Sequence, residues 1–155
     1  HAARRAPGLG IGNGFQVLCE AGLLPGALLH NVGQRFECKN VHIRAQTANS
    51  MLTHGIGDRT LKIPIAHGEG RYHADQATLL QLDDGDQVLF RYCDAEGRMT
   101  EQANPNGSEE NIAGVCNAQR NVFGMMPHPE RAADERLGNI DGRVLFTALL
   151  QAVPA

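Results

Sequence analysis

The sequence predicts an α/β fold in which helices flank a mixed β-sheet. Segments whose apolar residues alternate, as in half-buried strands, recur along the chain between segments with helical spacing. A glycine-dense run at residues 8–14 leads straight into one of these helical segments. Strands interleaved with helices pack as layers around a shared core. The 155 residues, of which 42% are hydrophobic and 20% charged, are enough for a single globular domain spanning 1–155.

The first half of the chain is expected to contribute one helix and three strands. Gly22 suits the left-handed position that follows a helix C-terminus, so it should close the helical run before it. Imperfect alternation at 35–45 indicates a long half-buried strand or a hairpin. Pro64 cannot donate to a neighbouring strand, so its strand belongs at the edge or end of the sheet. The expected elements are a short strand entering the glycine run, a helix at 15–21, and strands at 35–45 and 61–66.

The second half is expected to add three strands and two helices. The polar stretch at 94–108 is rich in Gly, Asn and Pro and must be a loop. The last two strands should form a hairpin, and Asp141 is expected to cap the final helix, whose apolar side chains share one face. The expected elements are a helix at 77–82, strands at 87–93, 112–116 and 122–126, and a helix at 143–153.

The balance of strands and helices suggests that elements are missing from the sequence. A mixed sheet of about six strands needs cover on both faces. Only two or three substantial helices are available, and almost no residues precede the first strand. We therefore expect the parent domain to hold further elements before this sequence.

Charge and cysteine usage exclude several functional classes. The net charge is -3 and there is no long basic run, so neither nucleic-acid nor membrane-surface binding has electrostatic support. No apolar run approaches the roughly 18 residues of a membrane helix. The four cysteines are widely spread without a C-x-x-C pair, which argues against a zinc ribbon or a redox motif. We expect reduced thiols, no metal and a cytoplasmic location.

The glycine run has the spacing of a nucleophile elbow. In such an elbow small residues flank a central position on a strained strand-to-helix turn, which exposes the central side chain at the helix N-terminus. Gly12 occupies the centre here, and it has no side chain with which to attack a substrate. A plain glycine turn and a fragment of a dinucleotide-binding loop are the alternatives. The second lacks its third glycine and a following strand–helix–strand unit.

A second motif, M-M-P-H-P-E-R at 125–131, follows an apolar strand. His128 lies at the strand's end between two prolines that restrict the backbone, which places it well for a general base. Glu130 could orient its ring and stabilise the imidazolium. The alternative is a loop histidine beside a surface Glu–Arg pair.

Two further loops carry polar side chains. H-G-E-G-R-Y-H at 67–73 resembles a metal cluster, but its two histidines lie six residues apart and no fourth ligand has zinc-like spacing. A glycine-lined loop that presents polar groups to a pocket or a partner is favoured. N-P-N-G-S at 104–108 consists of turn-forming residues, and a surface turn explains it.

Taken together, the motifs resemble the glutaminase subunits of phosphoribosylformylglycinamidine synthase, which are class I glutamine amidotransferases. The resemblance runs from residue 8 to about 150, with I-A-H-G-E-G-R, N-P-N-G-S and M-M-P-H-P-E-R in the same order as in that family. It implies a flavodoxin-like amidotransferase fold. It also implies that 1–155 is the C-terminal two-thirds of one amidotransferase domain, with the N-terminal third absent.

The resemblance implies a function. Such a subunit hydrolyses glutamine with a Cys-His-Glu triad and passes ammonia to a synthetase subunit. That partner uses ATP and Mg to convert formylglycinamide ribonucleotide to formylglycinamidine ribonucleotide in purine biosynthesis. The glutaminase subunit itself needs no cofactor and binds neither nucleic acid nor membrane; a small accessory subunit is a further candidate partner.

Residue by residue, the family's site maps onto several positions. His128 matches the base of the triad and Glu130 its orienting acid. The residues implied to contact substrate are Asn13 as oxyanion donor, Gly14, Gln16 and His67.

Two departures from the family pattern bear on activity. Gly12 stands where the family has its cysteine, so the chain is expected to be inactive. Cys19 cannot substitute, because seven residues of helix place it roughly 10 Å from the elbow. The second departure is the absent N-terminal third, which would supply another oxyanion donor. The alternative function is a non-catalytic module that keeps the synthetase-binding surface.

Overall fold

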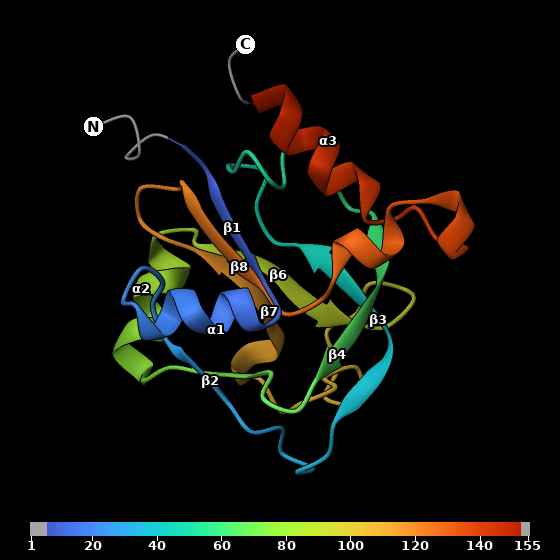
Figure 1. Cartoon of the computed structure of the whole chain (residues 1–155). Coiled ribbons are helices and arrows are strands. Elements are labelled where there is room, and N and C mark those ends of the chain that lie inside the picture. The colour runs from blue at the N-terminus through green and yellow to red at the C-terminus, as the bar shows by residue number, and fades with distance from the viewer. Residues whose placement is uncertain (1–5, 153–155) are drawn as a thin grey trace.

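The computed structural model describes residues 6–152, and in this range eight strands and three α-helices form an α/β fold (Figure 1). Six strands make one sheet in the order β1-β8-β7-β6-β3-β4, and β2 and β5 form a separate two-stranded sheet. The strands are β1 (Gly8–Ile11), β2 (Ala27–Leu29), β3 (Glu37–Ala45), β4 (Thr60–His67), β5 (Arg71–His73), β6 (Val88–Cys93), β7 (Ile112–Cys116) and β8 (Val122–Met125). The helices are α1 (Asn13–Glu20), α2 (Gln76–Asp84) and α3 (Arg143–Ala152), with short 3₁₀ turns at Glu109–Asn111, Pro129–Ala132 and Glu135–Leu137.

The main sheet is mixed, as predicted. β1 runs parallel to β8, whereas the other neighbouring pairs of this sheet are antiparallel. The parallel pairing aligns the C-terminal ends of β1 and β8, with Ile11 opposite Met125. The segments that follow these two strands therefore leave the sheet side by side. β4 lies at the opposite edge, where Pro64 was expected.

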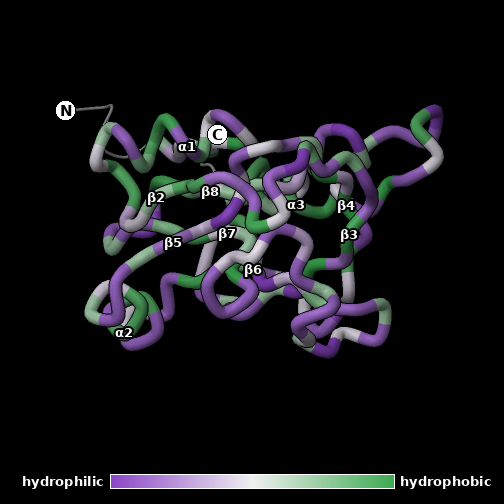
Figure 2. The backbone as a smooth tube through the Cα atoms, turned by 90° about the horizontal axis from the view of Figure 1, so that it is seen from below, coloured by the Kyte–Doolittle hydropathy of each residue, from purple (hydrophilic) through white to green (hydrophobic). Residues whose placement is uncertain are grey.

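Both faces of the sheet are buried. Along β8, Phe123 and Met125 belong to one hydrophobic cluster, whereas Val122, which precedes Phe123, packs against the other. Because successive side chains of a strand point to opposite faces, the two clusters lie on opposite sides of the sheet. One cluster includes Phe15 of α1 with residues of α2, and the other includes Leu145 of α3. In Figure 2 the chain is green mainly where it passes through these elements and purple in many outer loops.

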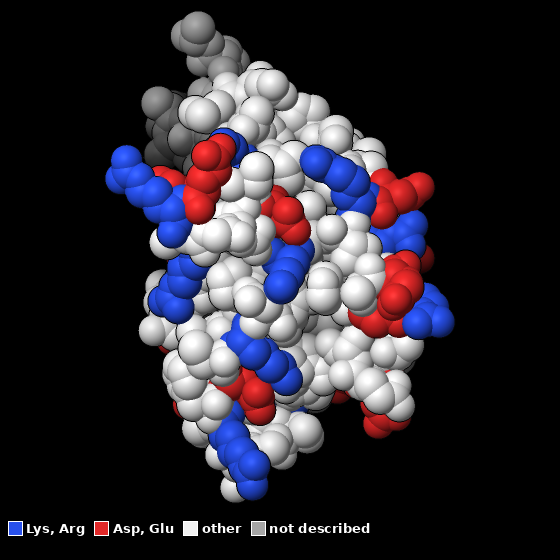
Figure 3. All heavy atoms as spheres, turned by 90° about the vertical axis from the view of Figure 1, so that its right-hand side faces the viewer, with Lys and Arg blue, Asp and Glu red and all other residues white. Residues whose placement is uncertain are grey.

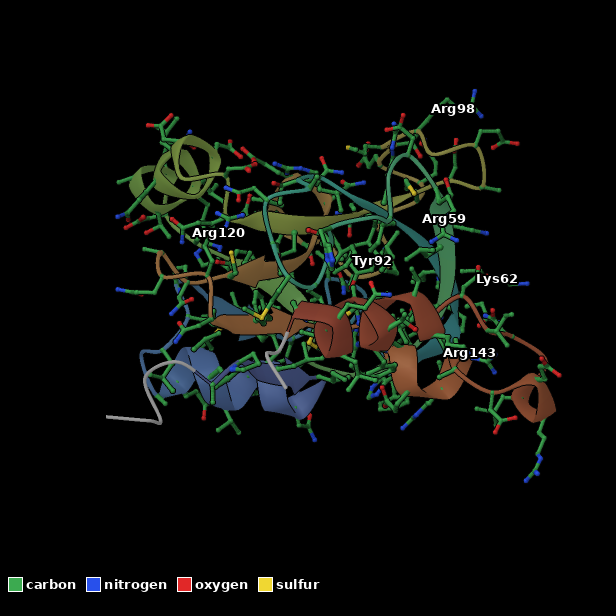
Figure 4. The ribbon with its side chains drawn as sticks, turned by 90° about the horizontal axis from the view of Figure 1, so that it is seen from above. Arg59, Lys62, Tyr92, Arg98, Arg120 and Arg143 are labelled. Atoms are coloured by element: carbon green, nitrogen blue, oxygen red, sulfur yellow. The ribbon has the colours of Figure 1, made fainter. Side chains whose placement is uncertain are left out.

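Each of the two hydrophobic clusters contains large side chains that are fully buried. The α1 side comprises Phe15, Tyr72, Leu82 and Val115 among others, and the α3 side comprises Ile43, Leu52, Ile63, Ile65, Leu89, Phe90, Tyr92, Phe123 and Leu145 among others. Figure 4 shows Tyr92 inside the molecule, whereas Arg98 and Lys62 project outward.

The predicted elements are confirmed with small shifts. The 35–45 segment forms one strand rather than a hairpin, and it begins at Glu37. The first helix begins two residues earlier than predicted, at Asn13, and Gly22 takes the left-handed conformation expected after it, with φ 71°. The two three-residue strands β2 and β5 were not predicted. Val153, placed in the last helix by the sequence pattern, lies outside the described residues.

The prediction that Asp141 caps α3 is wrong. The helix begins at Arg143, and the Asp141 carboxylate instead accepts a hydrogen bond from the backbone N–H of Lys62 at 2.8 Å. This bond connects the start of α3 to the edge strand β4. The Asp141 carboxylate therefore makes a long-range hydrogen bond in place of the expected N-cap hydrogen bond to the first turn of α3.

Surface charge, cysteine state and helix length can be described for the residues that the structure covers. Figure 3 shows basic and acidic side chains interspersed over one face of the molecule, without a large area of one sign. All four cysteines are free thiols. Within residues 6–152, no helix has both the length and the apolar character needed to cross a bilayer.

Candidate active site

Gly12 lies at the turn between β1 and α1. Its backbone has φ 57° and ψ -118°, a conformation that side chains disfavour and glycine tolerates. Its N–H donates to the carbonyl of Met125 at 2.9 Å, and its own carbonyl accepts from the N–H of Phe15 at 3.0 Å. The turn is therefore fixed by β8 on one side and by α1 on the other, as in a nucleophile elbow.

His128 faces this turn. A Cβ atom placed on Gly12 would lie 2.9 Å from His128 Cε1 and 3.0 Å from His128 Nε2. The His128 backbone N–H donates to the carbonyl of Pro64 at 2.8 Å, which attaches the segment after β8 to β4. The side chain is only 13% exposed. Any side chain at position 12 would thus project directly at the imidazole.

Glu130 orients the ring. His128 Nδ1 lies 2.6 Å from Glu130 Oε1, a distance typical of a charge-assisted hydrogen bond. Since a carboxylate can only accept, Nδ1 carries the proton, and in the neutral ring Nε2 is left as an acceptor toward Gly12. The structure brings together the predicted Gly12, His128 and Glu130. The Glu–Arg pair of the alternative is present as well, with Arg131 Nε 3.9 Å from Glu130 Oε1, but the histidine beside it is turned toward Gly12.

His67 ends β4 and is buried behind this site, 4% exposed. Its Nε2 lies 3.0 Å from Asn106 Nδ2, which must donate, so the ring is neutral with its proton on Nδ1. Burial, reinforced by the nearby His128 and partly offset by Glu37, lowers the pKa of His67 from 6.5 to about 4. Among the described residues, its Nδ1 has no hydrogen-bond partner. The geometry favours a supporting position for His67 rather than open contact with substrate.

The prediction that 104–108 is a surface turn is wrong for its second half. Asn106 is fully buried, 0% exposed, and Ser108 is buried as well. Besides His67, Asn106 Nδ2 donates to the carbonyl of Gly70 at 2.9 Å, while its Oδ1 accepts from Ser108 Oγ at 2.7 Å. The segment is an internal brace for the β4–β5 turn. The same residue types are common in exposed turns, so the local sequence does not distinguish a buried segment of this kind from an exposed turn.

The first turn of α1 presents the other predicted residues. Asn13 and Gly14 follow Gly12 directly, and N–H groups at the start of a helix have no partner within it. Gln16 Nε2 donates to Glu69 Oε2 at 3.0 Å and to Glu20 Oε1 at 3.3 Å. Sequence reasoning missed Glu69 as an individual residue, because this contact spans 53 positions.

Cys19, the cysteine of α1, is a poor substitute for the missing nucleophile. Cys19 is partly buried, and burial, followed by the nearby Glu20, raises the pKa of its thiol to about 12. It therefore stays protonated at neutral pH. Among residues 6–152, no group of three or more His, Cys, Asp or Glu side chains could hold a metal ion, and the 67–73 segment is a structured turn.

Comparison with known proteins decides the family. Residues 6–142 match the CobB/CobQ-like glutamine amidotransferase domain. The chain belongs to this glutamine amidotransferase family. Its α/β fold is that of the family, with the elbow and the histidine at adjacent strand ends.

Two curated relatives of this amidotransferase chain have the same name. The chain is 51% identical over 146 residues to phosphoribosylformylglycinamidine synthase subunit PurQ of Koribacter versatilis (strain Ellin345), covering 94% of this chain and 63% of that protein. It is 53% identical over 159 residues to the protein of the same name from Thermosynechococcus vestitus, covering 98% and 66%. It thus spans slightly less than two-thirds of the length of these relatives.

Solved structures agree with this placement. A chain in the structure of PurLQS from Thermotoga maritima matches with a TM-score of 0.81 and 41% identity, over 97% of this chain and 63% of that chain. Another glutamine amidotransferase from Thermotoga maritima matches with a TM-score of 0.52 and 17% identity, over 97% and 57%. The second likeness shows the amidotransferase fold alone.

Proposed function

We propose that this chain is the larger part of a glutaminase subunit of phosphoribosylformylglycinamidine synthase, with its nucleophile position occupied by Gly12. The intact subunit would release ammonia from glutamine for the ATP-dependent conversion of formylglycinamide ribonucleotide to its amidine. The observation that carries the proposal is the position of Gly12, whose missing side chain would point at Nε2 of His128. The names of the relatives supply the substrate.

The chemistry follows from the orientation of His128. A cysteine at position 12 would pass its proton to Nε2, and the thiolate would attack the amide carbonyl of glutamine. His128 would return that proton to the departing ammonia, leaving a thioester at position 12. Water, deprotonated by the same nitrogen, would release glutamate. Glu130 would keep Nδ1 protonated and stabilise the transient imidazolium.

With glycine at position 12 the first step cannot occur. Asn13 and Gly14 at the helix N-terminus would still offer N–H groups to the carbonyl oxygen, and Gln16 would still face the substrate. We therefore propose that the chain binds glutamine weakly and does not hydrolyse it.

The proposed partners follow from the same assignment. The synthetase subunit would receive the ammonia and would hold ATP and Mg, so this chain would need no cofactor of its own. A small accessory subunit would complete the complex, as the composite name PurLQS suggests for the Thermotoga assembly. The reaction would take place in the cytoplasm, in agreement with the four free thiols.

A non-catalytic module is the second candidate function, favoured by Gly12 itself. In that case the chain would retain the surface that binds the synthetase and contribute no chemistry.

Ammonia release in the presence of the synthetase subunit separates the two candidates. The chain should release none above background, because a lost nucleophile leaves only residual catalysis. Gly12→Cys in the chain with its N-terminal third restored should produce glutamate, and adding His128→Ala to that protein should abolish glutamate production again. Glutamate production by the unaltered chain that depends on His128 would contradict the proposal. A Gly12→Cys variant that binds the synthetase but stays inactive would favour the non-catalytic module.

A further inference from the structure

Three polar side chains from separate segments meet beside α1: Gln16 from the helix itself, His30 from the segment after β2, and Glu69 from the β4–β5 turn. Gln16 Nε2 donates to Glu69 Oε2 at 3.0 Å, and His30 Nε2 lies 3.4 Å from Glu69 Oε1. The Glu69 side chain is 43% exposed, so the carboxylate is oriented by its neighbours and remains open to a ligand.

The turn that carries Glu69 is held by buried amides on both sides. Asn31 Nδ2 donates to the carbonyl of His67 at 2.9 Å, and Asn31 Oδ1 accepts from the N–H of Gly70 at 3.0 Å. Asn106 holds the Gly70 carbonyl from the other side. A Cβ atom on Gly70 would overlap the His67 ring, so glycine is needed there. These hydrogen bonds fix the backbone of the turn and therefore the position of Glu69. An acidic residue that is only solvated would not require them.

The position of Gln16 relates this carboxylate to the reacting centre. The N–H of Gln16 points at the carbonyl of Gly12 at 3.4 Å, so the two residues are one helical turn apart, about 6 Å along the axis. The α-nitrogen and the amide carbon of glutamine are separated by four bonds, which span a similar length. A glutamine whose amide lies at Gly12 can therefore extend its amino-acid end toward Glu69.

We propose that Glu69, oriented by Gln16, binds the α-ammonium group of the amino-acid substrate. This assignment rests on the proposed function and adds the recognition of the substrate's charged end. The ammonium group has three donors, and a carboxylate forms charge-assisted hydrogen bonds with it. Because Gln16 uses its Nε2 on Glu69, its Oε1 is available as a second acceptor. Amino acids with a free α-amino group would be selected over deaminated or acylated ones.

Binding of two ligands to three proteins tests this assignment. The ligands are L-glutamine and glutaramate, which has the same side-chain amide and carboxylate but lacks the α-amino group. The proteins are the full chain, Glu69→Gln and the control Glu20→Gln, which removes the other carboxylate that Gln16 contacts. Since Gly12 prevents turnover, dissociation constants can be measured by NMR titration without loss of ligand.

The unaltered chain should bind glutamine at least about tenfold more tightly than glutaramate, the loss expected for one charge-assisted bond. Glu69→Gln should weaken glutamine binding by a similar factor and leave glutaramate binding unchanged, whereas Glu20→Gln should alter neither. Equal binding of both ligands by the unaltered chain, or equal weakening of both by Glu69→Gln, would overturn the ammonium site while leaving the proposed function standing. Failure of glutamine to bind at all would overturn both.

Discussion

At the scale of single residues, Gly12 combines two constraints that a side chain would violate. Its φ of 57° disfavours any Cβ, and that Cβ would press on His128, whose ring is held by Glu130. Backbone strain of this kind is characteristic of functional turns, where it exposes a reactive side chain. Glycine at this position adopts the positive φ without the strain that a side chain would add.

Restoring a side chain at position 12 should therefore lower stability. We expect Gly12→Ala and Gly12→Cys each to reduce the free energy of unfolding by about 1–3 kcal/mol, measured by urea denaturation. Gly14→Ala is the matched control, because a Cβ there meets nothing within 4 Å and replaces glycine inside the same helix. It should raise stability by about 0.5–1 kcal/mol. A Gly12→Ala protein as stable as Gly14→Ala would show that the turn is not strained.

At the scale of elements, α1 packs closely against β8 because the residue of β8 beneath the helix is a glycine. Gly124 of β8 lies under α1, and a Cβ there would overlap the Phe15 ring and lie 2.6 Å from Leu24 Cδ1. Phe15 also stacks on Tyr72 with ring centroids 5.9 Å apart, so it has little room to move. The position of α1, and with it the elbow, depends on this close approach.

Gly124→Ala should push α1 away from the sheet. Overpacking of a buried contact costs about 1–3 kcal/mol, and the thermal midpoint should fall accordingly. Gly8→Ala in the neighbouring strand is the control, since a Cβ there meets nothing within 4 Å. Two variants with the same midpoint would mean that the close approach of α1 to β8 does not matter.

The elements also show how far sequence patterns reach. Alternation predicted β3, β4, β6, β7 and β8, because strands of four or more residues leave a periodic trace. β2 and β5 have three residues each, too few for any period. At the site, motifs predicted Gly12, His128 and Glu130, which lie in short contiguous patterns. Glu69 and Asn106 lie in motifs that the sequence singles out, but their partners are 53 and 39 positions away, so the local pattern does not reveal what either side chain contacts.

At the scale of the whole molecule, the buried His67 links stability to pH. Its pKa is about 4 in the folded protein and 6.5 in the unfolded chain, so the unfolded state binds more protons between these values. Stability is therefore full above pH 6.5 and falls as the pH drops toward 4. The shift corresponds to a loss of about 3 kcal/mol over that window.

The free energy of unfolding should accordingly decrease as the pH is lowered from 7 to 4. Chemical denaturation at a series of pH values measures this decrease. His67→Gln should flatten this dependence, because it removes the titrating ring. His54→Gln, at an exposed position, should leave the dependence as it is. An unchanged slope in His67→Gln would assign the acid sensitivity to other groups.

We propose that position 12 faces His128 as the nucleophile position of a glutamine-hydrolysing site. Covalent labelling of Gly12→Cys by an electrophilic glutamine analogue, 6-diazo-5-oxo-L-norleucine, tests it most directly, with the labelled residue located by mass spectrometry. The exposed Cys38 and the partly buried Cys19 are internal controls. We predict faster labelling at residue 12 than at either control, with the advantage lost in Gly12→Cys/His128→Ala. Labelling at residue 12 that is no faster than at Cys38 and indifferent to His128 would contradict the account.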